Sequence, residues 1–430
     1  MSLASIIVTL ASIVLAALLA LLMIPVLVWL ERRIAGLIQD RMGPNRTNLC
    51  GFRLGGVIQS FADVIKLVFK EEYYPSHIKT GKWLYTLAPA LMFATSLLAF
   101  MTIPFADNLI IENESFRIQA LPVDYGVLWY FAIGSMGIIG IVFGGWLSHN
   151  KYSLLGSQRA GAQMLGYELP MGLSIIAMIA TYQTIDFNQM VAWQSGTVLG
   201  FLPAWGILVQ PIAAIIFIIT VFAETNRAPF NVAEGESEIV AGHMTEFSAM
   251  KFAMYFMAEY IAMNTASAVV ITMFFGGYQL PYLGTLELKE NFTILMICCS
   301  IFLPFFIYFF IKWMRKNNAV RATVSTDSGR NFETKVLSIV LIGMTIFLEI
   351  VFLFLMFSTK DSIFANVTVT IIQIAIFVVK LMIFNIFFIV VRWTLPRFRY
   401  DQVQTLGWNY LLPISIANIF VTALVIVGVN

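Results

Sequence analysis

A series of long apolar runs limits how this chain can fold more than any other feature of its sequence. About 20 consecutive apolar residues span a bilayer as a helix, and ten stretches meet that length approximately: residues 3–30, 83–105, 126–147, 160–181, 205–223, 250–274, 292–313, 336–358, 366–391 and 411–429. The chain is 59% hydrophobic and only 12% charged over 430 residues, a balance atypical of water-soluble domains. The sequence therefore predicts an all-α integral membrane protein with one polytopic domain, residues 1–430.

The positions of the basic residues predict the orientation of these helices. All but four of the 26 lysines and arginines lie in alternate connections, residues 31–82, 147–160, 224–251, 312–335 and 392–410. Because cytoplasmic loops are enriched in Lys and Arg, we expect these connections inside and both termini outside. The first run ends in charged residues rather than at a small-residue cleavage site, so we expect it to be retained as a helix.

Few residues in the chain suit a metal or redox centre. The cysteines are Cys50, Cys298 and Cys299, without the spacing of an iron-sulfur or zinc site, and there are three histidines. No glycine-rich phosphate motif opens a helix, and topology explains the basic excess without a nucleic-acid partner. We therefore expect no metal and no nucleic acid.

Two polar segments between the apolar runs are candidates for a functional site. Residues 51–72 place apolar side chains on one side of a helix and Asp63, Lys66 and Lys70 on the other, which predicts an amphipathic helix at the cytoplasmic surface. Residues 224–249 form an acidic cytoplasmic loop with five glutamates. Its acids alternate around Gly235, which favours a non-helical loop at membrane level over a solvated one, because a dense acidic cluster gains nothing beside anionic headgroups.

Two glutamates lie inside predicted spans at matching depth. Glu168 and Glu259 are each about 12 Å from the cytoplasmic edge at 1.5 Å per residue, and Glu224 ends a third span. A lone intramembrane acid can simply hydrogen-bond a neighbouring helix, which is our interpretation of Glu349. The matched pair favours a proton path instead, because desolvated carboxylates exchange protons near neutral pH.

Charged residues also flank the inner ends of the first and ninth predicted helices. They are Glu31, Arg32, Arg33 and Arg41 at the first and Arg392, Arg397, Arg399 and Asp401 at the ninth. Topology signals alone explain the arginines equally well. Beside an amphipathic helix and an acidic loop, they could instead line a polar chamber that an amphiphile such as a quinone enters sideways from the bilayer.

Several motifs together carry a resemblance to a known family. They are ERRIAGLIQDRMGPNR, ADVIKLVFKE, QRAGAQMLGYELP, FAETNRAPFNVAEGESEIVAG, FMAEY and RWTLPRFRYDQVQTLGW, and they cover most of residues 20–274 and 370–415. The sequence resembles the NuoH-type membrane subunit of respiratory complex I, the NADH:quinone oxidoreductase, in which this type of subunit lies at the quinone site. This resemblance implies a multi-pass subunit of a proton-pumping translocase in the bacterial plasma (inner) membrane, with periplasmic termini and no redox centre of its own.

The resemblance also implies the roles of particular residues. Quinone-chamber positions correspond to Glu31, Arg32, Arg41, Asp63, Lys66, Glu71, Arg227, Arg392, Arg397, Arg399 and Asp401. Proton-path positions correspond to Tyr167, Glu168, Glu224, Glu234, Glu236, Glu238, Glu259 and Tyr260. Quinone, either ubiquinone or menaquinone, is the implied substrate. FMN and iron-sulfur clusters belong to partner subunits.

The implied partners are the peripheral-arm subunits at the quinone site and at the terminal iron-sulfur cluster, the small membrane subunits next to the pumping modules, and membrane lipid. The chain departs from the family at Gly166, where Ser is frequent, and at Phe247, where Tyr is frequent. Residues 275–365 read as an insertion that adds two transmembrane helices to the family's eight, and we expect the pair at the periphery. Two alternatives stay open: a homologous subunit of an energy-converting hydrogenase or another donor-linked complex, and a free-standing cation transporter, which the lack of an internal repeat disfavours.

Overall fold

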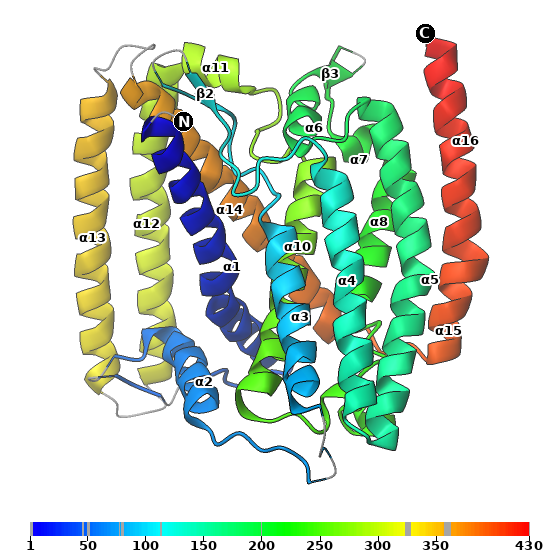
Figure 1. Cartoon of the computed structure of the whole chain (residues 1–430). Coiled ribbons are helices and arrows are strands. Elements are labelled where there is room, and N and C mark those ends of the chain that lie inside the picture. Colours follow the sequence, from blue (N-terminus) through cyan, green and yellow to red (C-terminus); the bar gives the residue numbers. More distant parts are fainter. Residues whose placement is uncertain are drawn as a thin grey trace.

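The computed structural model is a helical bundle with two short β-hairpins (Figure 1), and it describes residues 3–44, 47–49, 52–76, 78, 81–111, 114–198, 200–322, 328–356 and 363–429. Within these residues nine helices are long and apolar enough to cross a membrane. They are α1 (Leu3–Ile38), α3 (Lys82–Phe100), α4 (Gly126–Leu147), α5 (Lys151–Tyr182), α10 (Ala249–Phe274), α12 (Phe292–Ala322), α13 (Ser328–Met356), α14 (Ile363–Thr394) and a continuous run, Tyr400–Gly428, that ends in α16 (Leu412–Val429). The predicted all-α membrane fold is confirmed, and both chain ends lie at the same end of the bundle (Figure 1).

The fifth predicted span, residues 205–223, is divided between two shorter helices. Helix α7 (Gly206–Val209) is followed by α8 (Pro211–Glu224), which has 14 residues. Gln210 between them leaves helical geometry, with φ −133° and ψ 66°, and Pro211 suits the first position of a new helix because it needs no N–H partner there. The Gln210 amide donates to Thr181 Oγ1 at 3.2 Å and Thr422 Oγ1 at 3.0 Å, so the break is tied to the helices on either side.

Short elements connect the long helices. They are the turn Leu54–Gly56 and helix α2 (Val57–Phe69), the hairpin of β1 (Leu109–Ile111) and β2 (Glu114–Phe116), α6 (Phe187–Trp193), the hairpin of β3 (Thr197–Val198) and β4 (Leu202–Pro203), α9 (Glu236–Ile239), the turn Gly242–Met244, α11 (Thr285–Glu290), α15 (Tyr400–Thr405) and the π-helical segment Leu406–Leu411. Both hairpins are antiparallel.

Glycines of α4 allow it to approach its neighbours closely. A Cβ added at Gly140 would lie only 2.9 Å from the carbonyl oxygen of Ala88 in α3, and one added at Gly144 would overlap the hydroxyl of Tyr255 in α10. Small residues permit such close packing. In a membrane this packing drives helix association, because lipid tails are as apolar as the side chains and provide no hydrophobic effect between helices. Helices α3 and α4 therefore approach each other at backbone distance, and Gly144 leaves room for the Tyr255 side chain of α10.

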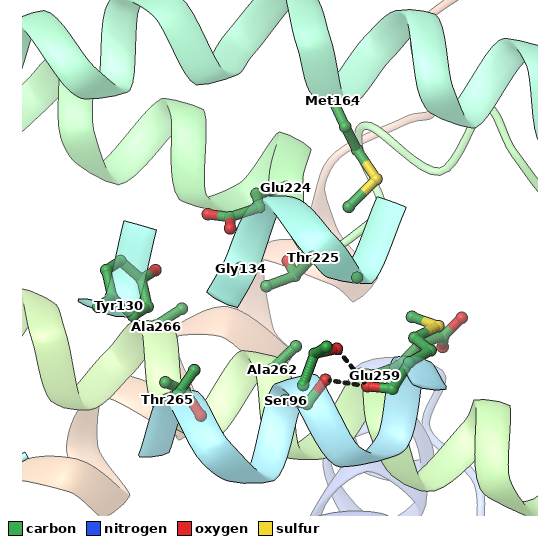
Figure 2. A pocket seen from close by; sticks show the side chains of 14 residues that line it. Ser96, Tyr130, Gly134, Met164, Glu224, Thr225, Glu259, Ala262, Thr265 and Ala266 are labelled. Atoms are coloured by element: carbon green, nitrogen blue, oxygen red, sulfur yellow. Dashed lines mark hydrogen bonds between the residues drawn. The ribbon is translucent and has the colours of Figure 1, made fainter. Parts of the chain in front are cut away.

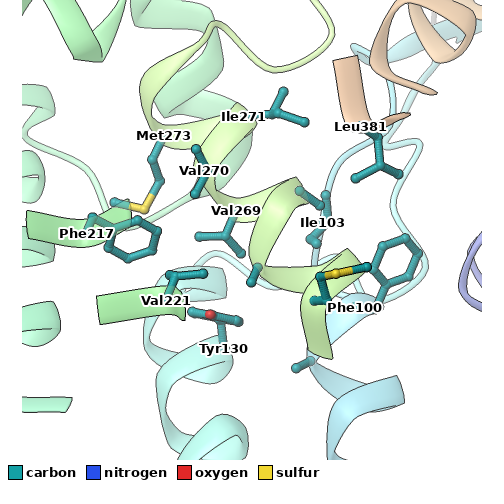
Figure 3. Close-up of a cluster of buried hydrophobic side chains, with 14 of the residues drawn as sticks. Phe100, Ile103, Tyr130, Phe217, Val221, Val269, Val270, Ile271, Met273 and Leu381 are labelled. Carbon is teal, nitrogen blue, oxygen red and sulfur yellow. The ribbon is translucent and has the colours of Figure 1, made fainter. Parts of the chain in front are cut away.

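Helix α10 is the centre of the bundle. In its most apolar window 83% of the residues are buried, against 11% in α12 and in α13, which lie at one edge of the molecule (Figure 1). Its side chains Val269 and Met273 pack with Phe217 of α8 in the main apolar core (Figure 3). A polar group on α10 is consequently enclosed by protein and not by lipid.

Lys380, in the middle of α14, fixes the far end of α10. Its ammonium donates to the carbonyl oxygens of Phe275, Gly277 and Gln279 at 2.8, 2.9 and 2.5 Å. A cation at a helix C-terminus satisfies carbonyls that have no partner within the helix. This explains how a lysine is tolerated inside an apolar helix.

Candidate functional site

Glu31 is the centre of a buried charge cluster formed by four segments of the chain. Its carboxylate lies 2.5 Å from Nη1 of Arg392 in α14 and 3.1 Å from Nη1 of Arg227, in the loop after α8. Tyr260 of α10 donates a hydrogen bond to the same carboxylate at 2.6 Å. The side chains of Glu31 and Arg227 are only 9% and 3% exposed, so this pair is desolvated, whereas Arg392 is 28% exposed.

Arg227 is held on two sides. Its guanidinium carbon lies 4.0 Å from the centre of the Tyr260 ring, a cation–π contact, and one of its nitrogens faces Glu31. Burial opposes the charged form, but Tyr260 and Glu31 favour it more strongly, and the pKa of Arg227 is raised. The Nε and Nη2 atoms are buried without a hydrogen-bond partner within the described residues. The cluster therefore has unused donors.

A second ion pair joins α1 to the amphipathic helix α2. Arg32 Nη1 lies 2.5 Å from the carboxylate of Asp63, and both side chains are partly exposed. Asp63 also accepts a hydrogen bond from Gln59 at 3.0 Å. Helix α2 is thus fixed against the C-terminal end of α1, with its polar residues at the rim of a cleft.

That cleft opens between α1, α2 and α10 and has a volume of about 330 Å³. Apolar side chains form most of its wall, including Val28, Val64, Phe256 and others, and the predicted quinone-chamber residues Arg32, Asp63 and Lys66 also line it. An apolar slot with a few polar groups at one end suits an amphiphile with a long tail and a polar head.

Glu168, Glu224 and Glu259 line two neighbouring cavities. The larger, about 50 Å³, is lined by Glu224 and Glu259 and lies between α3, α4, α8 and α10 (Figure 2). The smaller, about 10 Å³, is lined by Glu168 and again by Glu224. A water molecule needs roughly 10–15 Å³ of such volume, so the first has room for a few waters and the second for about one. Glu224 borders both.

The neighbours of these carboxylates could not be predicted from the sequence. Ser135 of α4 donates to the Glu168 carboxylate, and Tyr130 of the same helix lines the larger cavity together with Glu224. A Cβ added at Gly134 would lie 3.2 Å from a Glu224 carboxylate oxygen, so the absence of a side chain there leaves the acid its space. Serine, tyrosine and glycine are common in apolar helices, and no sequence signal identified them as partners.

The acidic loop is partly helical, so the prediction of a non-helical loop from its alternating acids was wrong at this point. It contains a helical turn, α9, after Gly235 with a positive φ of 36°, and the one-turn segment Gly242–Met244. Glu234 is half-buried and accepts a hydrogen bond from the Asn231 amide at 2.5 Å. Glu238 instead forms an exposed ion pair with Arg159 of α5 at 2.6 Å. Glu236 begins α9, and its side chain lies outside the described residues.

Tyrosines next to the buried acids have different partners. Tyr260 bonds Glu31 and so belongs to the charge cluster, although it was predicted on the proton path. Tyr167 is buried and donates to the carbonyl oxygen of Val403 in α15 at 2.8 Å. Neither lines the glutamate cavities.

The remaining predicted chamber residues are exposed on this chain. They are Arg41, Glu71, Arg397, Arg399 and Asp401, after the C-terminal end of α1, after α2 and around the start of α15. The Nε of Arg41 donates to the Gln39 side chain at 2.6 Å. The structure does not bring these five into the buried cluster around Glu31.

Gly166 and Phe247, the two positions at which the chain departs from the family pattern, are closely packed. Gly166 faces α15 and the π-helical segment Leu406–Leu411, where an added Cβ would lie 3.1 Å from Trp408 Nε1 and 3.4 Å from the Gln404 side-chain oxygen. Phe247 stacks on Tyr85, with ring centres 4.3 Å apart and an interplanar angle of 6°. Neighbouring side chains thus pack against both positions, although the hydroxyls frequent in the family are missing there.

The fold and the buried charges define the class of protein: a polytopic α-helical membrane protein that holds carboxylates in cavities between its helices. A family model described as NADH dehydrogenase matches residues 10–322 and 327–423, and the chain belongs to this family. Both helices of the α12–α13 pair lie within the matched ranges.

Similar curated proteins identify the type of subunit. The H subunit of NADH-quinone oxidoreductase from Flavobacterium psychrophilum is 34% identical over 415 residues, 96% of either chain. Subunit 8 of the Rhodothermus marinus enzyme is 35% identical, covering 94% of this chain and 93% of that protein, and the H subunit from Salinibacter ruber is 34% identical, covering 95% and 92%. The resemblance to NuoH-type subunits is confirmed, and the chain is a membrane subunit of complex I.

Proposed function

We propose that this subunit forms the quinone entrance of its complex and the start of the proton path that couples quinone reduction to proton translocation. In this proposal the cleft between α1, α2 and α10 admits the quinone, the cluster around Glu31 responds to the charge of the reacting head, and Glu259, Glu224 and Glu168 pass the response on as proton movement.

The observation that carries the proposal is that all three parts share helix α10. Phe256 and Met257 line the quinone cleft, Tyr260 bonds Glu31, and Glu259 lines the glutamate cavity. Successive residues of a helix point in directions 100° apart, so one turn reaches three neighbouring compartments. A charge change at the cleft therefore acts on Glu259 over a distance of about one helical turn.

The proposed chemistry assigns no redox centre to this chain. Reduction of a quinone to quinol consumes two electrons and two protons. We assign the electrons to iron-sulfur clusters, with FMN, in partner subunits. The residues of this chain would orient the head group and hold or exchange protons, which intramembrane carboxylates with room for water can do. The periplasmic termini, the bacterial plasma membrane and the inserted helix pair remain part of this proposal.

Glu224→Gln tests the proton path. The amide keeps the size of the side chain but cannot exchange a proton, so we expect proton pumping by the complex in membrane vesicles to fall strongly, and quinone reductase activity with it if the two are coupled. Glu234→Gln tests the loop in the same way, and exposed Glu290→Gln is the matched control. Full pumping and full quinone reductase activity in both Glu224→Gln and Glu234→Gln would refute the path.

Val64→Trp tests the entrance. Val64 lines the cleft and is 38% exposed, so a larger side chain at this position should fill the cleft without disturbing a packed core. We expect the KM for quinone to rise. Ile65→Trp, on the neighbouring position that does not line the cleft, is the control and should leave the KM unchanged. Equal kinetics for both variants would exclude this entrance.

A further inference from the structure

We propose that Lys251 is a positioning residue for the quinone cleft, because it ties residues 70–76, called the strap below, to the first turn of α10. This inference rests on the proposed function of the cleft. Lys251 is 1% exposed, and its ammonium lies 3.2 Å from a carboxylate oxygen of Glu72 and 3.2 Å from the centre of the Tyr74 ring. These three residues are called the Lys251 clamp below.

The Lys251 clamp is unusual because it buries a charged lysine side chain. A lysine is seldom fully buried, because removing an ammonium from water is expensive unless it is paired. Here one carboxylate, itself 42% exposed, and one aromatic face do the pairing. The same Tyr74 ring has Lys82 Nζ on it at 5.6 Å, and its hydroxyl lies 3.3 Å from Thr86 Oγ1. The strap is thereby held to α3 as well as to α10.

The backbone supports the same attachment. The N–H of Tyr73 donates to Ser248 Oγ, at the N-cap of α10, at 3.3 Å. Tyr85 of α3 donates to the carbonyl oxygen of Glu246 at 2.8 Å, which fixes the approach to that helix. Residues 70–76, which connect α2 to α3, are therefore attached along the start of α10.

The consequence for the cleft follows from which residues line it. Met250 and Phe252, on either side of Lys251, line the cleft from α10, and Lys70, at the end of α2, lines it from the strap side. Helix α2 is attached to α1 through Arg32 and Asp63. The Lys251 clamp is the corresponding attachment on the α10 side. It therefore sets the distance between α2 and α10, which form two walls of the cleft.

The test uses the whole complex in membranes. Glu72→Gln and Tyr74→Leu remove the clamp from its partly exposed side, where folding is least endangered, and Lys251→Met removes it at the centre. We expect the KM for a long-tailed quinone to rise about tenfold while kcat stays within about twofold, because lost preorganisation of the cleft weakens binding. Lys251→Arg, which keeps a cation over the ring and beside Glu72, should restore the KM.

Controls separate this inference from the proposed function and from general damage. Asp124→Asn removes a carboxylate from another ion pair, with Arg117, and should change nothing. NADH oxidation with a water-soluble acceptor that bypasses quinone reports assembly and should stay constant. If Val64→Trp raises the KM but Glu72→Gln and Tyr74→Leu do not, the clamp does not position the cleft. If Val64→Trp has no effect, the entrance itself fails and the clamp with it.

Discussion

Breaking the buried pair of Glu31 and Arg227 gives the sharpest test of the charge cluster. Glu31→Gln keeps the shape of the side chain and an acceptor for Tyr260 but removes the charge. Removing one partner of a buried ion pair costs about 3–5 kcal/mol, because the other charge stays uncompensated, and Arg227 is 3% exposed. The contact to Arg392, 28% exposed, adds only about 0.5–1 kcal/mol after solvent screening.

The double variant makes the prediction quantitative. Arg227→Met leaves an apolar chain over the Tyr260 ring, and combining it with Glu31→Gln removes both charges together. The double variant should therefore lose less unfolding free energy than the sum of the losses in the two single variants. The difference, which is the coupling energy, should be about 2–3 kcal/mol. The measurement is the free energy of unfolding of the full chain in mixed micelles during a detergent titration.

A matched cycle on a partly exposed pair supplies the control. Arg32→Gln and Asp63→Asn break an ion pair of 2.5 Å whose side chains are 44% and 32% exposed, and their coupling should be below about 1 kcal/mol. Additive effects at Glu31 and Arg227, within about 0.5 kcal/mol, would show that the cluster does not act as a desolvated unit. An equally large coupling in the control pair would contradict the role given to burial.

Three further predictions concern the surrounding structure. Burial lowers the pKa of His243 from 6.5 to about 4, so the unfolded chain binds a proton that the folded chain does not. Stability should therefore fall by about 3 kcal/mol as pH drops from about 6.5 to 4, and His243→Gln should flatten that slope in unfolding titrations. Lys380→Met leaves three carbonyl oxygens without a donor and should lower the unfolding free energy by about 3 kcal/mol; an unchanged value would contradict the capping role. Gly144→Ala should cost about 1–3 kcal/mol by overlap with Tyr255. Tyr255→Phe should relieve part of it, while Gly343→Ala, with open space around it, should be neutral.

The helices and the kind of site could be predicted from the sequence because they depend on local quantities. Membrane-length apolar runs place α4 and α10 within one residue and α3 within five, since every backbone polar group in a bilayer must be bonded within its own segment. Helices α1, α5, α12 and α13 extend eight or nine residues beyond the predicted spans. The interruption at Gln210 could not be predicted, because the amide is stabilised by threonines of two distant helices.

Which charges meet was decided by the tertiary structure alone. The sequence indicated that Glu31, Arg227 and Arg392 are functional candidates together with Arg41, Arg397 and Arg399, and nothing local separates the first three from the others. Only packing of α1, α10 and α14 around the loop after α8 buries the first three as a cluster and leaves the rest exposed.

The sequence by itself determined a multi-helix membrane protein with costly carboxylates at matching depth, because transfer of charge into lipid is penalised wherever it occurs in a chain. Only the tertiary structure decided that Glu224 borders both cavities, that Tyr260 belongs to the Glu31 cluster, and that Lys251 is buried at the start of α10. These facts depend on which helix faces are turned toward each other. Such faces are set by close packing between segments far apart in the chain, which no local pattern records.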